Sequence, residues 1–341
     1  HVRSTAGVVL SGIRVHCSAW WWCTALHNSS DVLVSRLFVD GRFGRDGMDL
    51  VNCRRVTIED SRIEGSDDGL CFKTIADNGL GRFPMADVVV RRTELLSTWC
   101  NAIQFGSATE VDIHNFTFED LVITGARKAA IGIVSMDSAN ISGLTFRNIE
   151  IHGRNVATPL FVKLGNRIRG EDGKGHWPPG SISDVNLTGI RAVGWGNVSE
   201  PKPGHGTAYT ATIEGLNLSH TVGPIRLEGF DLVAPGGGTR GQVLIDPPIS
   251  PLDYQPRYNG VRPSWGLFVR YVRGLAVVSS SLSSATFDGR PAIVVDQVHA
   301  LVLSNTTAGG VNTHGCQLSY RNSSGNWTDA SACAWAPGGL R

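Results

Sequence analysis

Three aspartates stand at two turns of the chain, at a spacing that could bring their carboxyl groups together. Asp46 lies in the segment GRDGMDLV, and Asp67 and Asp68 lie in SDDGLCFKT, with Asp67 21 positions after Asp46. In each segment a polar turn precedes a short apolar strand. Carboxyl groups held close together raise at least one pKa, so that one group stays protonated while its neighbour is ionised. Hydrolysis of a glycosidic bond uses that division, with an acid for the leaving oxygen and a base for water.

Short strands that recur along the chain are the elements that would position these aspartates. Alternation of apolar and polar residues begins at Val8, Val32 and Val56, which are 24 residues apart. Further alternating segments begin at Val88, Val111, Ile141, Ile182, Ile225, Leu275 and Ala300. A second set of short strands lies between them, including DGMDLV, DGLCFKT, NAIQFGS and AAIGIVS. Helical periodicity is not visible over a useful length, so the sequence predicts an all-β fold.

Two all-β architectures fit alternating strands, and the turns decide between them. A sandwich would join its strands by hairpin turns such as Asn-Gly, which occur here only at Asn78 and Asn259, in irregular loops. A repeat of roughly 20 to 30 residues instead favours a solenoid. We predict a single right-handed parallel β-helix over residues 1–311, with residues 312–341 as a capping tail. Because a coil strand already begins at Val8, we expect either further coils or a partner chain at the N-terminal end.

In such a solenoid, successive coils lie about 4.8 Å apart, and residues one coil apart become neighbours. Asp46, Asp67 and Asp68 all precede the second strand of their coils, so we expect one carboxylate cluster on the surface of the solenoid. Two long polar segments, residues 167–180 and 235–264, are predicted loops that wall a groove there.

A run of three tryptophans, Trp20 to Trp22, adds aromatic surface near these coils. Strand alternation would expose at least one of the three indoles. Sugars stack on exposed tryptophan, although packing under a terminal coil explains the run equally well.

Composition indicates a globular, extracellular protein. The chain has 341 residues, 41% of them hydrophobic, and a net charge of +1. This balance excludes a general attraction to nucleic acid or to anionic membranes, and no apolar run approaches the ~20 residues that span a bilayer. Nine N-x-S/T sequons favour a secreted glycoprotein. They begin at Asn28, Asn115, Asn140, Asn186, Asn197, Asn217, Asn305, Asn322 and Asn326.

The seven cysteines fit disulfides and core positions better than a metal site. No C-x-x-C pair is present, which excludes a zinc ribbon or a thioredoxin-like site. We expect a disulfide between Cys316 and Cys333 first, and one between Cys17 and Cys23 second. The remaining three, Cys53, Cys71 and Cys100, read as small buried residues. No histidine spacing indicates a metal, so we expect neither metal nor cofactor, with calcium on the three aspartates as the alternative.

The aspartate segments resemble the motifs of glycoside hydrolase family 28, the polygalacturonase and rhamnogalacturonase family. Its members carry N-T-D, then G-D-D one coil later, then G-H-G and R-I-K, on a right-handed β-helix. GRD stands where N-T-D would be, and SDD where G-D-D would be. The resemblance implies Asp67 as the general acid, Asp46 and Asp68 as the residues that hold and activate water, and inversion of the anomeric centre.

The later motifs depart from the family pattern. Asn101 in CNAIQFGS stands at the histidine of G-H-G, and an amide cannot titrate. R-I-K aligns with residues 161–163, where only Lys163 is kept and Arg167 is placed to replace the arginine. The resemblance thus implies a substrate-binding set of Asn101, Lys163 and Arg167, to which Lys73 could add a positive charge.

These observations predict a secreted glycoside hydrolase that cleaves a pectin-like or other acidic polysaccharide without a cofactor. The alternative is a non-catalytic extracellular-matrix or cell-surface β-helix glycoprotein derived from the same family.

Overall fold

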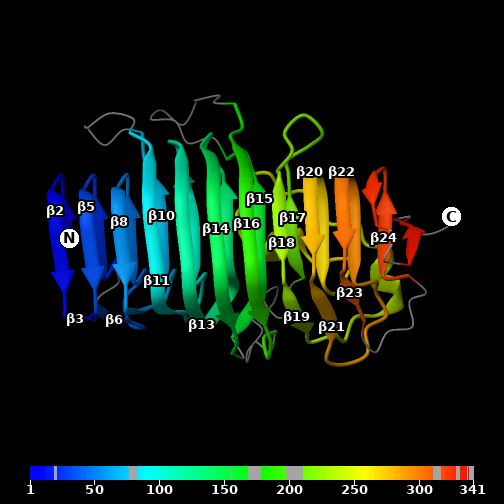
Figure 1. Cartoon of the computed structure of the whole chain (residues 1–341), viewed down its shortest axis with the longest axis horizontal. Coiled ribbons are helices and arrows are strands. Elements are labelled where there is room, and N and C mark those ends of the chain that lie inside the picture. Colours follow the sequence, from blue (N-terminus) through cyan, green and yellow to red (C-terminus); the bar gives the residue numbers. More distant parts are fainter. Residues whose placement is uncertain are drawn as a thin grey trace.

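Parallel strands stack coil upon coil from the N-terminal to the C-terminal end of the chain (Figure 1). The computed structural model describes residues 1–18, 21–76, 83–153, 155–167, 178–196, 210–309, 316–327, 331–335 and 337. Each strand pairs in parallel with the equivalent strands of the coils before and after it. The chain is therefore an all-β solenoid, and its pairings sort into three ladders that run along its length.

The first ladder contains β2 (Ala6–Ser11), β5 (Ser30–Ser35), β8 (Arg54–Glu59), β11 (Met85–Ser97), β13 (Ile113–Ser135), β14 (Asn140–Ile151), β16 (Ser181–Ala192), β18 (Ile225–Glu228), β20 (Leu267–Val278), β22 (Ile293–Ser304) and β25 (Gly325–Asn326). The second contains β3 (Arg14–His16), β6 (Phe38–Gly41), β9 (Arg62–Gly65), parts of β11, β13, β14 and β16, β19 (Asp231–Ala234), β21 (Ser281–Ser284) and β23 (Thr307–Ala308).

The third ladder carries the predicted site. It contains β1 (Val2–Arg3), β4 (Thr24–His27), β7 (Met48–Val51), β10 (Leu70–Thr74), β12 (Ile103–Thr109), the end of β13, β15 (Val156–Leu164), β17 (Ala211–Glu214), the starts of β20 and β22, β24 (Leu318–Arg321) and β26 (Ala332–Ala334). Two short 3₁₀ helices, η1 (Arg240–Leu244) and η2 (Pro256–Asn259), lie in the predicted loop 235–264.

The repeat read from the sequence is the coil of the structure. Ser30 pairs with Ala6 on one side and with Arg54 on the other, which gives the 24-residue offset of the first coils. Later coils are longer, with an offset of 28 residues between β13 and its neighbours and 50 residues further on. Pairing continues through β24 and β26, so the ladder extends into the predicted capping tail.

Inward-facing side chains stack into one continuous core. The first ladder aligns Val32, Val56, Val88, Phe116 and Leu144 in successive coils, and all of them are buried. Neighbouring positions stack aromatic rings, as Phe118 and Phe146 do at a centroid distance of 4.6 Å. Since alternate residues of a strand point outward, each ladder also presents an outer face. Within the strands, only these outward side chains can contact a substrate.

Polar residues at the corner between the first and second ladders have a local cause. Asp60, Asp120 and Asn148 adopt φ angles of 51°, 55° and 53°, a left-handed conformation that Asp and Asn tolerate better than most residues. The corner is also bonded from coil to coil, because Asn148 Nδ2 donates to Asp120 Oδ1 at 2.6 Å.

Both predicted disulfides are present, Cys17 with Cys23 and Cys316 with Cys333, at Cα separations of 5.5 and 5.8 Å. The other three cysteines are free and buried, as expected. Six sequon asparagines are exposed: Asn115, Asn140, Asn217, Asn305, Asn322 and Asn326. Asn28 and Asn186 are half-buried, and Asn197 lies outside the described residues. Within the described chain, no helix has the length and apolar character needed to cross a bilayer.

Candidate active site

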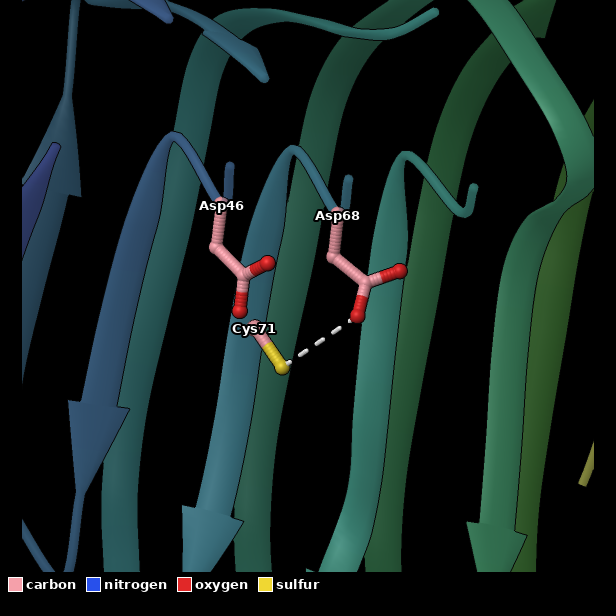
Figure 2. A group of neighbouring side chains, drawn as sticks. All are labelled: Asp46, Asp68 and Cys71. Carbon is pink, nitrogen blue, oxygen red and sulfur yellow. Dashed lines mark hydrogen bonds between the residues drawn. The ribbon is translucent and has the colours of Figure 1, made fainter. Parts of the chain in front are cut away.

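Stacking of the third ladder places Asp46 and Asp68 at the same position of adjacent coils. Met48 pairs with Leu70, and the Gly47 N–H donates to the Asp68 carbonyl oxygen at 2.9 Å. Figure 2 shows the two carboxyl groups side by side, with Cys71 below and between them. One ligand atom from each of Asp46, Asp68 and Cys71 lies within 4.8 Å of the others. The sequence prediction that these coils bring the aspartates together is therefore confirmed.

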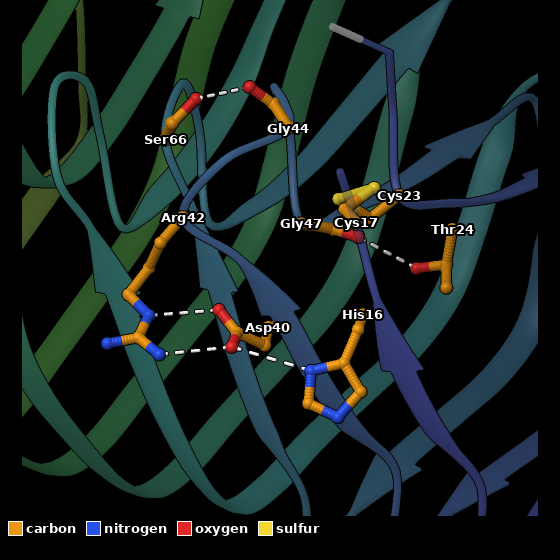
Figure 3. Close-up of a disulfide and its surroundings, with 9 residues drawn as sticks. All are labelled: His16, Cys17, Cys23, Thr24, Asp40, Arg42, Gly44, Gly47 and Ser66. Atoms are coloured by element: carbon orange, nitrogen blue, oxygen red, sulfur yellow. Dashed lines mark hydrogen bonds and ion pairs between the residues drawn. A yellow bond between two sulfur atoms is a disulfide. The ribbon is translucent and has the colours of Figure 1, made fainter. Parts of the chain in front are cut away.

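The turn that carries Asp46 packs against the Cys17–Cys23 disulfide (Figure 3). A Cβ atom on Gly44 would lie 2.7 Å from Cys23 Sγ, so only glycine fits there. Ser66 Oγ donates to the Gly44 carbonyl at 2.6 Å, and the Cys23 N–H donates to the Asp46 carbonyl at 2.9 Å. These contacts fix the backbone of Asp46 from both neighbouring coils.

One residue earlier in each coil lies a second column of side chains, Arg45, Asp67, Cys100 and Lys128, which follows from the register of the strands after them. Arg45 Nη2 binds Asp67 Oδ2 at 3.1 Å. On the other side, one ligand atom each of Asp67, Asp68 and Cys100 lie within 4.8 Å of one another, and the Lys128 N–H donates to the Cys100 carbonyl at 3.0 Å. The Asp67 side chain is 29% exposed, compared with 5% for Asp46.

Asp67 opens onto a groove of about 640 Å³. The groove is lined by Arg42, Phe43, Gly44, Arg45, Ser66, Asp67, Trp99 and Cys100. Two of its aromatic rings face solvent, since Phe43 is 73% and Trp99 is 50% exposed, and Arg127 stacks over the Trp99 ring at 4.5 Å. Trp21 is also exposed, as expected for one member of the tryptophan run, while Trp20 lies outside the described residues.

The adjacent carboxyl groups have pKa values shifted in opposite directions. Burial, followed by the charges of Asp46 and Asp67, raises the pKa of Asp68 to about 7. Burial would also raise the pKa of Asp67, but the Cys100 thiol and the positive charges of Lys128 and Arg45 outweigh it, and the net pKa is lowered. The resemblance implies that Asp67 is the acid. In the structure Asp67 contacts the groove, but Asp68 has the higher pKa and takes up a proton first as the pH falls.

Separation of the carboxyl groups bears on the expected inversion. Oxygen atoms of Asp68 lie within 4.8 Å of both Asp46 and Asp67. Inverting glycosidases typically separate their acid and base by roughly 6.5–9.5 Å to admit water. The closest oxygen atoms of Asp67 and Asp68 therefore lie nearer to each other than this range.

Lys73 and Asn101 do not occupy the substrate-binding positions predicted for them. Lys73 Nζ binds Asp46 Oδ2 at 2.6 Å and also contacts Asp49, and its side chain is only 13% exposed. Asn101 is buried behind Asp68, to which its backbone N–H and its side-chain amide donate at 3.0 and 3.3 Å. Both residues hold carboxylates of the site in place, so neither is free to bind sugar.

Lys163 and Arg167 are not open to the groove either. Lys163 is fully buried and donates to the Ile249 carbonyl at 2.5 Å, beneath the loop that carries η2. Arg167 forms two hydrogen bonds to Asp137, at 2.6 and 3.1 Å, with 13% of its side chain exposed. The loop 235–264 thus covers the outer face at Lys163 instead of leaving a wall beside an open groove. Most of the other loop, residues 168–177, lies outside the described residues.

Lys128 and Tyr254 are functional candidates that the sequence did not single out. The ammonium of Lys128 and the guanidinium of Arg167 each lie 5.6 Å from the centre of the Tyr254 ring. Burial lowers the pKa of Lys128, but the neighbouring Cys100 and Asp68 outweigh it and the net pKa is raised. The Lys128 side chain is therefore a cation. Aligning AAIGIVS with DGLCFKT and NAIQFGS would have placed Lys128 in the Asp67 column.

On distance alone, Asp46, Asp68 and Cys71, or Asp67, Asp68 and Cys100, could hold a cation. The donor atoms do not fit calcium, which takes six to eight oxygen ligands, because each set offers two carboxylates and a thiol. The Cys71 thiol already donates to the Gly106 carbonyl at 2.9 Å, and Lys73 supplies positive charge beside Asp46. The cluster therefore fits proton exchange better than calcium binding.

Comparison with known proteins gives no family assignment. No family model and no curated protein matches the chain. Among solved structures, a family 28 exopolygalacturonase from Yersinia enterocolitica is similar at 13% identity and a TM-score of 0.48, over 93% of this chain and 44% of that one. The catalytic unit of a thermostable GH87 α-1,3-glucanase from Streptomyces thermodiastaticus strain HF3-3 is similar at 12% identity and a TM-score of 0.40, over 91% and 61%. Both are glycoside hydrolases by name, and this chain spans less than two thirds of either.

Proposed function

We propose that this protein is a secreted, glycosylated glycoside hydrolase that cleaves a pectin-like or other acidic polysaccharide. The observation that carries the proposal is the pair Asp67 and Asp68, whose pKa values are shifted apart beside a groove with exposed aromatic rings. Titratable neighbours with separated pKa values are typical of acid–base sites. The groove's arginines and Lys128 favour an anionic substrate, and Trp99 and Phe43 favour sugar stacking.

In this proposal, Asp67 and Asp68 act together as the acid. Asp67 reaches the leaving oxygen from the groove wall, and Asp68 holds the proton at neutral pH. Because the two groups are coupled, they titrate as a pair, and the proton can pass to Asp67 as substrate displaces Arg45 or water. Asp46 is the base that orients water. The right-handed winding of the solenoid stays a prediction. Inversion of the anomeric centre is also a prediction, and proton NMR of the first anomer released checks it.

The test is release of reducing ends from a panel of plant and algal polysaccharides, acidic and neutral. Wild type should act on an acidic member, and Asp67→Asn and Asp68→Asn should each lower the rate by about 10²- to 10⁴-fold while keeping the fold. A non-catalytic extracellular glycoprotein is the second candidate, because Asp46 and Asp68 are nearly buried. Binding to a polysaccharide without any release of reducing ends, by a folded protein, would support that candidate and contradict the first.

A further inference from the structure

A buried ion cluster lies directly behind the candidate acid–base residues. Lys73, from β10, binds Asp46 Oδ2 at 2.6 Å and contacts Asp49 Oδ1 of β7. The Trp22 ring covers the ammonium, whose nitrogen lies 4.5 Å from the ring centre. Exposed fractions of the three charged side chains are 13% for Lys73, 5% for Asp46 and none for Asp49. The two carboxylates take two of the three N–H donors of the ammonium, and the Trp22 ring covers the nitrogen.

Charge within this cluster is uneven. Lys73 lies near Asp46 and Asp49 of the preceding coil and near Asp68 of its own coil. Among the described residues, no second cation binds Asp46 or Asp49. Burial, opposed by Lys73 and assisted by Asp46, raises the pKa of Asp49 well above its usual range. Asp49 therefore competes less than Asp46 for the charge of Lys73.

The other titratable groups that face the cluster do not compete for this charge. His27 of β4 lies on the same outer face, stacked on Trp22 at 6.0 Å, and burial followed by nearby positive charges lowers its pKa. Burial raises the pKa of the Cys71 thiol, which therefore stays neutral. Burial lowers the pKa of Lys73, but Cys71 and the carboxyl groups of Asp49, Asp46 and Asp68 outweigh it, and the net pKa lies well above the usual value. Lys73 is thus the permanent charge of this buried layer.

We propose that Lys73 is a positioning residue of the site, which holds the Asp46 carboxylate beside Asp68 through its ion pair, with Asp49 as a second anchor and Trp22 as a cover against water. The expected effect on the reaction rate rests on the proposed hydrolysis. The expected effect of Lys73 on the carboxyl groups does not. The inference predicts that loss of the lysine charge changes at which pH the carboxyl cluster takes up a proton.

The experiment compares Lys73→Met with Lys163→Met. Lys163 is a matched control, because it is a buried lysine on the same outer face that binds a different carboxylate, Glu214, at 3.4 Å. In Lys73→Met, the acidic limb of the pH–rate profile should move upward by about 1–3 pH units, as loss of an opposite charge within a few ångströms implies. Lys73→Arg should restore the wild-type limb. Lys163→Met should lower stability and leave the limb unchanged.

A second readout separates failure of this inference from failure of the proposed function. Carbon-13 carboxyl NMR of the substrate-free protein follows the aspartate titrations whether or not hydrolysis is found. If wild type releases no reducing ends, an upward-shifted titration of the carboxyl cluster in Lys73→Met still supports the inference. A profile and a titration that coincide with wild type would overturn it and leave Lys73 a merely structural residue. If Lys73→Met does not fold, Lys73→Gln, which keeps a hydrogen-bond donor but not the charge, decides by the same criteria.

Discussion

The outer face of the third ladder carries charged side chains at both ends of the solenoid, and the two ends differ in how these charges are paired. Towards the C-terminal end, Lys163, Glu214, Arg270, Asp296 and Arg321 occupy one column in five successive coils. Their signs alternate. Arg270 Nε binds Glu214 Oε1 at 2.9 Å, and Arg321 Nε binds Asp296 Oδ1 at 2.8 Å.

At the N-terminal end of the same face, the charges do not balance. Asp46, Asp49 and Asp68 surround Lys73, and Asp49 Oδ2 is buried without a hydrogen-bond partner among the described residues. A buried polar atom without a partner is costly, whereas the alternating column satisfies its members. One outer face of the solenoid can therefore serve two purposes. The column from Lys163 to Arg321 stabilises the stacking of the coils, and the cluster around Lys73 holds carboxyl groups that can exchange protons.

Glu214→Gln tests the stabilising end and should have the largest effect. Glu214 accepts hydrogen bonds from Arg270 and from Asn259. Its removal leaves the buried Lys163 without its counter-charge and Arg270 with only the partly exposed Asp246. We expect a loss of about 3–5 kcal/mol in the free energy of unfolding, measured by urea denaturation.

A matched control for this prediction is Glu228→Gln, which breaks the exposed pair of Arg226 and Glu228. An exposed pair contributes about 0–1 kcal/mol. Similar losses in both variants would show that the buried column stabilises no more than surface ion pairs do, and the comparison between the two ends would fail.

The pH dependence of stability tests the unpaired end. The pKa of Asp68 is about 7 in the folded protein, compared with an ordinary value of 3.8 for an aspartate, so the folded state binds the proton more tightly. This contribution to stability is complete below pH 4 and is lost as the pH rises through about 7. The expected slope is up to about 1.4 kcal/mol per pH unit for one proton.

Urea unfolding between pH 4 and 8 measures this slope. Asp68→Asn should reduce it, while Asp49, whose pKa is also raised, contributes with the same sign in both proteins. Asp31 and Asp40 have pKa values lowered to about 2 by their arginine partners, so their contributions change below pH 4 and do not interfere. An unchanged slope in Asp68→Asn would mean that another group binds the proton, and the assignment of the raised pKa would be wrong.

Most of the solenoid could be predicted because its cause is local. Alternating residues with a fixed offset place Val32, Val56 and Val88 in one buried column whatever the loops do. The same offset brought Asp46 beside Asp68, since both precede strands that pair in register. Where a position in the coil decides the outcome, the sequence was sufficient.

The surroundings of the site could not be predicted in the same way, because they depend on loops of irregular length. Lys163 was expected to bind sugar. Instead it is covered by the loop that carries η2, in which Asn259, 96 residues further along the chain, accepts a hydrogen bond from it. Tyr254, from that loop, meets Lys128 and Arg167 for the same reason. Whether an outward side chain is free or covered is a property of tertiary packing, and no spacing within the strand reports it.

Two tryptophans, one at each end of the solenoid, also differ in exposure. Replacing them should have the smallest effect of the changes considered. Trp99 at the N-terminal end and Trp335 at the C-terminal end each stack with an arginine, Arg127 at 4.5 Å and Arg321 at 4.6 Å. Trp99 is half exposed in the groove, but Trp335 is buried and donates its indole N–H to the Val243 carbonyl at 2.7 Å. Similar pairs thus occupy an open and a covered position.

Trp99→Ala should therefore weaken binding of an acidic oligosaccharide by about 2- to 12-fold, which corresponds to the 0.5–1.5 kcal/mol of an aromatic contact, with little loss of stability. Trp335→Ala should lower stability and leave the affinity unchanged. Isothermal titration calorimetry and urea unfolding of both variants measure the two quantities. Equal affinity in Trp99→Ala and wild type would exclude the Trp99 ring as a sugar platform, and would leave the charged groups of the groove to bind the substrate alone.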